Sequence, residues 1–284
     1  MLRIVDLNSV TAGADVTQSL LDCGFVVVEN HAISLDELRV FYEAWAHFFL
    51  SDERDDYLVD PESQSGYFPA ASAETAKNSE AQDLKEYFQY RPECSMPALL
   101  RSMTTHYYDE LFSLGKTVLG WIEQYSPSSL WQSLDQPLAE YLVPGRTMLR
   151  VLRYTPLTGN EPGGAIRAAA HEDIDFITLL PAATMPGLEI KPKGNGWLPV
   201  NAPAGSIIIN MGDMMQELTQ GALPSTTHRV VNLEGADASL ARITAPLFCH
   251  PKDDLVLSER YTAGEYLDKR LSQINPTHLR PRNK

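Results

Sequence analysis

The sequence predicts a mainly β fold with flanking helices, in which an antiparallel sandwich or jelly roll follows a helical N-terminal region. Seven short segments rich in β-branched and apolar residues lie between residues 148 and 248, separated by Gly, Pro, Asn and Asp turns. Short strands spaced in this way are typical of antiparallel sheets. Residues 1–125 instead carry apolar side chains at helical spacing. We therefore expect a helix-rich region over 1–125, packed on a β-rich core over 126–284 as one compact unit.

The N-terminal region begins with three predicted elements, a short strand over residues 2–7, a helix over 14–21 and a buried strand over 24–31. Ser34 and Glu37 have the spacing of a capping box, which predicts an amphipathic helix that ends near Leu50. Residues 51–82 are mostly polar and predict either a lid or binding loop or a plain surface loop. A strand over 83–90 and a long amphipathic helix over 97–124 follow.

The β-rich core follows a segment with several Pro and Ser residues, over 126–144. Its predicted strands are 148–154, 176–180, 187–190, 197–200, 206–210, 228–232 and 242–248. Residues 212–218 predict one or two helical turns between two of these strands. Thr262 and Glu265 repeat the capping-box spacing and start a last helix that reaches about Ile274.

The charge and cysteine content narrow the class of protein. A formal charge of −14 argues against a nucleic-acid-binding protein whose affinity depends on Lys and Arg. No apolar run approaches the roughly 18 residues that span a bilayer, and no signal peptide is recognisable, so we expect a cytoplasmic protein without membrane contact. Cys23, Cys94 and Cys249 are widely spaced and predict free thiols in a reducing compartment.

A cluster of possible metal ligands stands in the core. His171 and Asp173 are two residues apart, so on a strand both side chains would point to the same face while Glu172 points away. A His-x-Asp motif is too short to be a specific signal by itself, but another histidine, His228, follows in the segment 225–231. Two imidazoles and one carboxylate can bind Fe(II) on one side and leave the other side open for substrate and O₂.

A second pair on a later predicted strand complements the metal ligands. Arg242 and Thr244 are also two residues apart and would share a face. A guanidinium can bind a carboxylate through two parallel hydrogen bonds, and the hydroxyl adds another donor. An iron site next to a carboxylate clamp indicates a 2-oxo acid as co-substrate.

These features resemble the isopenicillin N synthase-like branch of the Fe(II)/2-oxoglutarate-dependent dioxygenases. The similarity covers roughly residues 2–252. Its landmarks are Cys23-Gly24-Phe25 to His31, Gly66-Tyr67-Phe68, Asp83-Leu84-Lys85-Glu86, Leu149-Arg150 to Tyr154, His171-Glu172-Asp173, Pro186-Gly187-Leu188, Asn210-Met211-Gly212-Asp213, Ser225 to Val230 and Arg242-Ile243-Thr244-Ala245-Pro246.

The resemblance implies a double-stranded β-helix core in which His171, Asp173 and His228 bind Fe(II). It also implies that Arg242 and Thr244 hold the distal carboxylate of 2-oxoglutarate, with a hydrogen bond from Tyr154. Because halogenating relatives lack the carboxylate ligand, Asp173 favours hydroxylation, desaturation or cyclisation of a small molecule, with O₂ consumed and succinate and CO₂ released.

Two positions depart from the family pattern. Thr244 replaces a Ser, which keeps the hydroxyl but adds a methyl group, and Leu152 replaces an Asn that often precedes the clamp tyrosine. Neither change removes the positive charge of the clamp.

The residues that contact the substrate are harder to predict. We expect Tyr67, Phe68, Asp175 and Met211 to line the mouth of the site. Arg153 could bind a substrate carboxylate, but alternation from the clamp tyrosine points it to the other face of the strand, where it would form a structural ion pair.

Two further histidines are predicted to be structural. His31 and His250 each lie beside a predicted strand with no second ligand in phase. We therefore expect both to be hydrogen-bonded scaffold residues outside the metal site.

Two other functions fit parts of the sequence. The first is an Fe(II)/O₂ oxidase of the isopenicillin N synthase or aminocyclopropanecarboxylate oxidase type, which does not use 2-oxoglutarate and would bind the substrate's own carboxylate with the same clamp. The second is a metal-binding jelly roll without turnover. The sequence is compatible with a monomer or a small homo-oligomer.

Overall fold

The computed structural model describes residues 1–70, 83–161 and 165–274. Its strands are Ile4–Asp6 (β1), Phe25–Glu29 (β2), Gly66–Phe68 (β3), Lys85–Tyr90 (β4), Met148–Tyr154 (β5), Ala168–His171 (β6), Ile177–Pro181 (β7), Leu188–Ile190 (β8), Leu198–Pro199 (β9), Ile207–Met211 (β10), His228–Val230 (β11), Arg242–Thr244 (β12), Leu247–Cys249 (β13), Val256–Ser258 (β14) and Tyr261–Thr262 (β15). The α-helices are Ala12–Cys23 (α1), Leu35–Leu50 (α2), Ala98–Tyr125 (α3), Asp213–Leu218 (α4) and Ala263–Ile274 (α5). Short 3₁₀ helices span Asp52–Tyr57, Ser128–Trp131, Leu138–Tyr141 and Gly235–Ser239.

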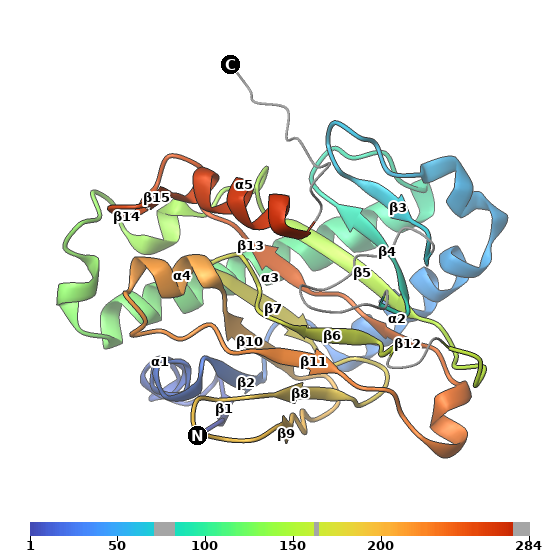
Figure 1. Cartoon of the computed structure of the whole chain (residues 1–284), viewed down its shortest axis with the longest axis horizontal. Helices are drawn as coiled ribbons and strands as arrows, with labels where there is room; N and C mark the ends of the chain where they lie inside the picture. Colours follow the sequence, from blue (N-terminus) through green and yellow to red (C-terminus); the bar gives the residue numbers. More distant parts are fainter. Residues whose placement is uncertain (71–82, 162–164, 275–284) are drawn as a thin grey trace.

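The described strands form one large and one small sheet, with a separate β14–β15 hairpin. The large sheet has nine strands in the order β1-β2-β10-β7-β13-β5-β4-β3, with β12 also paired to β5. The small sheet has the order β6-β11-β8-β9. Neighbouring strands are antiparallel except β1 and β2, which run parallel. Strands from residues 1–125 and from residues 126–284 are therefore hydrogen-bonded into the same sheet (Figure 1).

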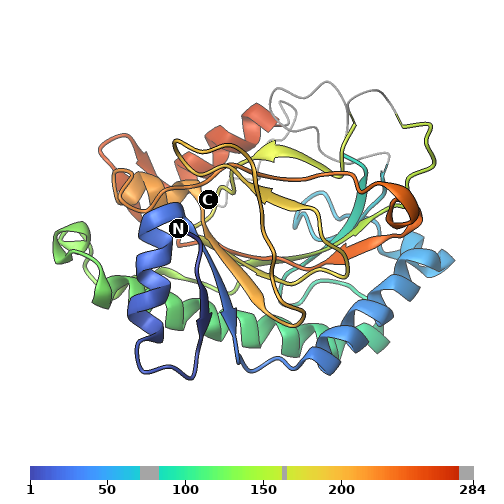
Figure 2. The same cartoon turned by 90° about the horizontal axis from the view of Figure 1, so that it is seen from below.

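The two faces of the large sheet carry different apolar clusters. The larger cluster joins one face to α1, α2 and α3, which lie along one side of the strands in Figure 2. The smaller cluster lies on the other face and includes residues of β8 and β11 from the small sheet. Adjacent residues alternate between the clusters, as Val26 and Val27 of β2 do. The interior between the two sheets is thus separate from the core beneath the helices.

The boundaries of the first two helices agree with the sequence pattern. The Ser34 hydroxyl accepts the Glu37 N–H, and the Glu37 carboxylate accepts the Ser34 N–H, which confirms the capping box of α2. α1 ends at Gly24, whose φ of 69° belongs to the left-handed region that favours glycine. A Cβ at Gly24 would also lie 2.2 Å from the Pro224 carbonyl oxygen, so no larger residue fits there.

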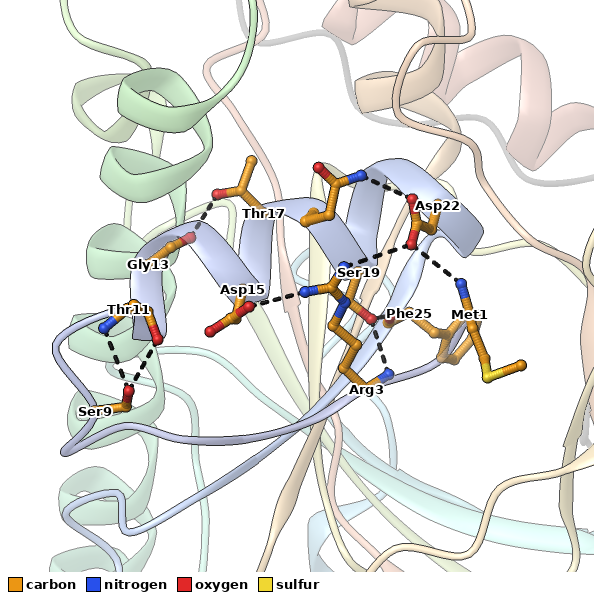
Figure 3. Close-up of polar contacts among 11 residues, drawn as sticks. Met1, Arg3, Ser9, Thr11, Gly13, Asp15, Thr17, Ser19, Asp22 and Phe25 are labelled. Atoms are coloured by element: carbon orange, nitrogen blue, oxygen red, sulfur yellow. Dashed lines mark hydrogen bonds and ion pairs between the residues drawn. The ribbon is translucent and has the colours of Figure 1, made fainter.

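Polar contacts attach β1 to α1 (Figure 3). The Arg3 guanidinium binds Asp15 at 2.8 Å, and the Arg3 N–H donates to the Ser19 hydroxyl at 3.1 Å. Ser19 in turn donates to the Phe25 carbonyl at 2.7 Å. These bonds fix the edge of the large sheet against its first helix.

The predicted surface segment 51–82 is more ordered than expected where it is described. It contains a 3₁₀ helix and β3, and β3 pairs with β4 through the register Tyr67 to Phe88. This pairing extends the large sheet by one strand and accounts for the adjacent aromatic residues Tyr67 and Phe68 in an otherwise polar segment. Residues 71–82, which carry the rest of the predicted lid, lie outside the described residues. No helix in the described ranges is both long enough and apolar enough to cross a membrane.

A candidate metal centre and carboxylate pocket

The small sheet places two histidines side by side. His171 ends β6 and His228 begins β11, and the two are direct partners in the antiparallel register. Directly opposed residues point to the same face of a sheet, which brings the ring centroids to 4.4 Å. The Nε2 atoms of His171 and His228 lie 3.9 Å and 3.7 Å from Asp173 Oδ1. One potential ligand atom from each residue lies within 4.8 Å of the others.

Asp173 reaches this position by a different route from the one predicted. β6 ends at His171, and Asp173 lies in the turn that connects the small sheet to β7 of the large sheet. The expectation that His171 and Asp173 share the face of one strand is therefore wrong. A register irregularity between β6 and β11 also breaks simple alternation there. The chain instead turns back toward the imidazoles as it crosses between the sheets.

Backbone carbonyls orient both imidazoles. The Ala169 carbonyl accepts from His171 Nδ1 at 2.7 Å, and the Thr226 carbonyl accepts from His228 Nδ1 at 3.1 Å. Since a carbonyl can only accept, each Nδ1 carries the proton and each Nε2 keeps a lone pair for a metal. The pKa of His171 is lowered to about 4, mainly by burial and next by the nearby His228. The lower pKa favours the neutral imidazole, which is the form that binds a metal.

The large sheet holds the Asp173 carboxylate from behind. Asn210 Nδ2 donates to Asp173 Oδ2 at 2.8 Å, and the Thr178 hydroxyl donates to the same oxygen at 2.6 Å. Asn210 on β10 and Thr178 on β7 are direct register partners, so both side chains project to the same face. Burial raises the pKa of Asp173, but the neighbouring histidines and these two hydrogen bonds outweigh it and lower the pKa. Oδ1 remains directed at the histidines.

Asp175 lies behind this network and not at the mouth of the site. It has no exposed surface, and its Oδ2 is 3.1 Å from the Thr178 hydroxyl. Burial and the negative charge of Asp173 raise the pKa of Asp175 well above its usual value. The expectation that Asp175 faces a substrate does not fit this position, because a fully buried carboxyl group behind Asp173 leaves no surface for a substrate to contact.

Gly212 permits this close packing. Its φ is −98°, so the backbone conformation does not require glycine, but a Cβ there would lie 2.2 Å from the Asp175 carbonyl oxygen. The Gly212 N–H also donates to the Phe176 carbonyl at 3.0 Å. A side chain at this position would displace the turn that carries Asp173.

The residues of the predicted carboxylate clamp are buried on the face of the large sheet that also carries Asn210 and Thr178. Arg242 on β12 is the register partner of Tyr154 on β5, and its Cζ lies 5.2 Å from the Tyr154 ring centroid. Arg242 Nε donates to the carbonyls of Met185 and Pro186 at 3.0 Å and 3.2 Å. Arg242 Nη1 and Thr244 Oγ1 are buried and have no hydrogen-bond partner among the described residues. Buried donors normally find an acceptor, so these two suit a carboxylate.

Two family models match the chain. Residues 146–251 match the 2OG-Fe(II) oxygenase superfamily, and residues 4–109 match the N-terminal region of the non-haem dioxygenase in morphine synthesis.

The chain belongs to the 2OG-Fe(II) oxygenase superfamily.

This oxygenase is similar along its length to several known proteins. It is 42 % identical to a putative oxygenase from Shewanella oneidensis of known structure, with a TM-score of 0.86 and coverage of 96 % of this chain and 98 % of that one. It is 27 % identical to feruloyl CoA ortho-hydroxylase 2 of Arabidopsis thaliana, over 90 % of this chain and 71 % of the relative. A full-length Neurospora crassa protein, solved in complex with alpha-KG, shares the fold, with 20 % identity, a TM-score of 0.76 and 95 % coverage of each chain.

Family membership confirms the predicted double-stranded β-helix fold and the predicted cofactors. The oxygenase depends on non-haem Fe(II), with 2-oxoglutarate and O₂ as co-substrates. The comparisons do not support the alternative of an oxidase without 2-oxoglutarate, nor that of a metal-binding protein without turnover.

The other predicted substrate residues divide between the two faces of the large sheet. Tyr67 packs in the cluster beneath the helices, and its hydroxyl donates to Glu86 at 2.5 Å. Met211 is fully buried in the same cluster. Neither side chain lines the interior face. Successive residues of a strand point to opposite faces, and the neighbours Phe68 and Asn210 are the ones that point inward. Phe68 is on the interior face, where it stacks on Tyr87 with ring centroids 4.5 Å apart.

The residues predicted to be structural lie outside the metal cluster. Arg153 forms an ion pair with the buried Glu86 at 2.5 Å, as the structural alternative predicted. His31 is bonded through Nε2 to the Gly205 carbonyl at 2.6 Å. His250 is bonded through Nδ1 to the carbonyl of the preceding strand at 3.2 Å. These three side chains therefore serve the scaffold.

Three residues that support the site were not predicted as site residues. Asn210 and Thr178 hold Asp173, and Gly212 makes room for the turn that carries it. The periodicity of β10 and β7 could have placed Asn210 and Thr178 on the interior face. No local pattern reveals the close contact of Gly212 with a segment distant in sequence.

Replacing Asp173 with Ala should abolish tight Fe(II) binding. The change removes the only charged ligand of the three, and we expect the affinity to fall by more than about 100-fold. Anaerobic equilibrium dialysis measures it, with circular dichroism to verify the fold. Glu172→Ala is the matched control, because the Glu172 carboxylate is hydrogen-bonded to Thr227. Equal Fe(II) affinity in both variants would contradict the ligand role.

Replacing Gly212 with Ala should weaken both the fold and the metal site. The new methyl group meets the Asp175 backbone, and we expect a loss of about 1–3 kcal/mol in the free energy of unfolding together with weaker Fe(II) binding. Gly120→Ala in α3 is the control, since nothing lies within 4 Å of its Cβ. There the free energy of unfolding should rise by about 0.5–1 kcal/mol. Denaturant titration of both variants distinguishes close packing from a general loss of glycine.

Proposed function

We propose that His171, Asp173 and His228 bind the Fe(II) of this oxygenase. The main support for the proposal is that each of the three side chains has one polar atom hydrogen-bonded to the protein and a second polar atom that faces the other two residues. Both Nδ1 atoms and Asp173 Oδ2 are engaged with protein groups, whereas both Nε2 atoms and Asp173 Oδ1 converge within the 4.8 Å cluster. Three converging ligands with fixed orientation suit a metal that keeps open positions for other ligands.

Arg242, Thr244 and Tyr154 bind the distal carboxylate of 2-oxoglutarate in this proposal. Two buried donors without an acceptor among the described residues, Arg242 Nη1 and Thr244 Oγ1, support this role. Arg242 Nε donates to the Met185 and Pro186 carbonyls, and these bonds hold the guanidinium in place before any ligand binds. A pre-oriented donor set loses little entropy on binding, which favours affinity. The methyl group of Thr244, the departure from the family pattern, leaves its hydroxyl available.

The protein's part in the reaction is to position ligands and exclude water. Bound at these residues, Fe(II) and 2-oxoglutarate would supply the chemistry that couples the reduction of O₂ and the decarboxylation of 2-oxoglutarate to succinate and CO₂ with a two-electron oxidation of the substrate. His171, Asp173 and His228 would hold the metal, and the clamp would fix the direction of 2-oxoglutarate. The apolar cluster around Phe25, which packs edge-on against His228 at 5.6 Å, lowers access of water from that side.

The primary substrate is a small molecule that is hydroxylated, desaturated or cyclised. The carboxylate ligand Asp173 favours these reactions over halogenation, and the hydroxylase and dioxygenase names among the relatives support them. Phe68 is the one predicted mouth residue on the interior face, so it stays in the proposed substrate site. The cytoplasmic location and a monomeric or small homo-oligomeric state remain predictions.

Replacing Arg242 with Met tests the clamp. We expect the KM for 2-oxoglutarate to rise about 10- to 100-fold, because charge-assisted hydrogen bonds to the distal carboxylate are lost. Succinate release measures the dependence. Arg229→Met is the control, since Arg229 pairs with Glu189 at 2.7 Å on the small sheet and its side chain is 30 % exposed. An unchanged requirement for 2-oxoglutarate in Arg242→Met would contradict the proposal.

A further inference from the structure

A second arginine is buried next to the clamp, and none of the described carboxylates pairs with it. Arg167 directly precedes β6 and has no exposed surface. Its Nη2 donates to the Leu240 carbonyl at 2.8 Å, two residues before Arg242. Its Nε and Nη1 are buried and have no hydrogen-bond partner in the described ranges 1–70, 83–161 and 165–274.

No described carboxylate neutralises Arg167. The nearby Asp83 accepts the Ala169 N–H at 3.0 Å, but its other oxygen pairs with Lys85 at 2.8 Å. Burial is the main cause that lowers the pKa of Arg167 and also that of Arg242, and the positive charge of Arg167 lowers the pKa of Arg242 further. Two guanidiniums thus lie within electrostatic reach of each other, and a buried, unpaired charge is costly. The arrangement calls for a bound anion.

We propose that Arg167 binds the distal carboxylate of 2-oxoglutarate together with Arg242. The location supports this ligand, since Arg167 is anchored to the Leu240 carbonyl two residues before Arg242, and the Arg242 guanidinium in turn lies over the Tyr154 ring. A carboxylate has about four lone-pair positions, so it can accept from two guanidiniums as well as from Thr244. The inference rests on the proposed clamp and adds a second cation to it.

A pair of 2-oxo acids isolates the distal carboxylate. 2-Oxoglutarate and 2-oxovalerate have the same carbon chain and the same metal-binding end, but only the former has the distal carboxylate. Calorimetric titration of the full chain loaded with Mn(II) gives the ratio of their affinities without turnover. In Arg167→Met we expect this ratio to shrink about tenfold or more, with less than about a twofold change for 2-oxovalerate itself.

Further variants keep the test decisive. Arg167→Lys preserves the charge without the planar fork, so it should fold even if Arg167→Met does not, and it should recover only part of the ratio. Arg260→Met is the matched control, because Arg260 is 69 % exposed and pairs with Glu217. An unchanged ratio in folded Arg167 variants would overturn the inference and would point to a carboxylate on the primary substrate. A ratio that shrinks in Arg242→Met but not in Arg167→Met would refute this inference alone, whereas no change in either would refute the proposed clamp as well.

Discussion

The hydrogen bonds from Asn210 and Thr178 to Asp173 Oδ2 are the contacts on which the site depends most. His171 and His228 belong to the small sheet, and Asn210 and Thr178 belong to the large one. Asp173 stands in the connection between the sheets and is held by the large sheet while it faces the histidines. The geometry of the proposed metal ligands is therefore tied to the packing of the two sheets. Gly212 is part of the same constraint, because any side chain there would push against the turn.

Residues along each strand of the large sheet alternate between a face that packs in the core beneath the helices and a face that points to the candidate site. One face supports the aromatic and aliphatic core beneath the three N-terminal helices, and charged residues that fall on it, such as Arg153 and Glu86, pair with one another. The other face carries Asn210, Thr178 and the Arg242 clamp toward the small sheet. A residue's phase in its strand thus decides whether it supports the fold or reaches the site. This explains why Phe68 and Tyr67 have different environments although they are neighbours in the sequence.

The sequence predicts the candidate metal ligands and the clamp because His171 and Asp173, and likewise Arg242 and Thr244, stand two residues apart, and because His228 and the other landmarks follow in the order of the family that the chain resembles. The structure places Arg242 and Thr244 on one strand as expected, but Asp173 is brought in by a turn, which local alternation does not reveal. The close contact of Gly212 with Asp175, the burial of Asp175 and the burial of Arg167 all depend on segments that are distant in sequence. Such features follow from how sheets pack, and periodicity within one strand carries no information about them.

The most direct test of the account is an anaerobic titration of the protein with Fe(II) followed by 2-oxoglutarate, monitored by visible absorbance. Chelation of Fe(II) by a 2-oxo acid produces a charge-transfer band, so we expect a band that grows only when both are present and saturates at about one 2-oxoglutarate per chain. Absence of the band from folded protein that binds Fe(II) would contradict the claim that the interior between the two sheets holds the iron and the co-substrate together.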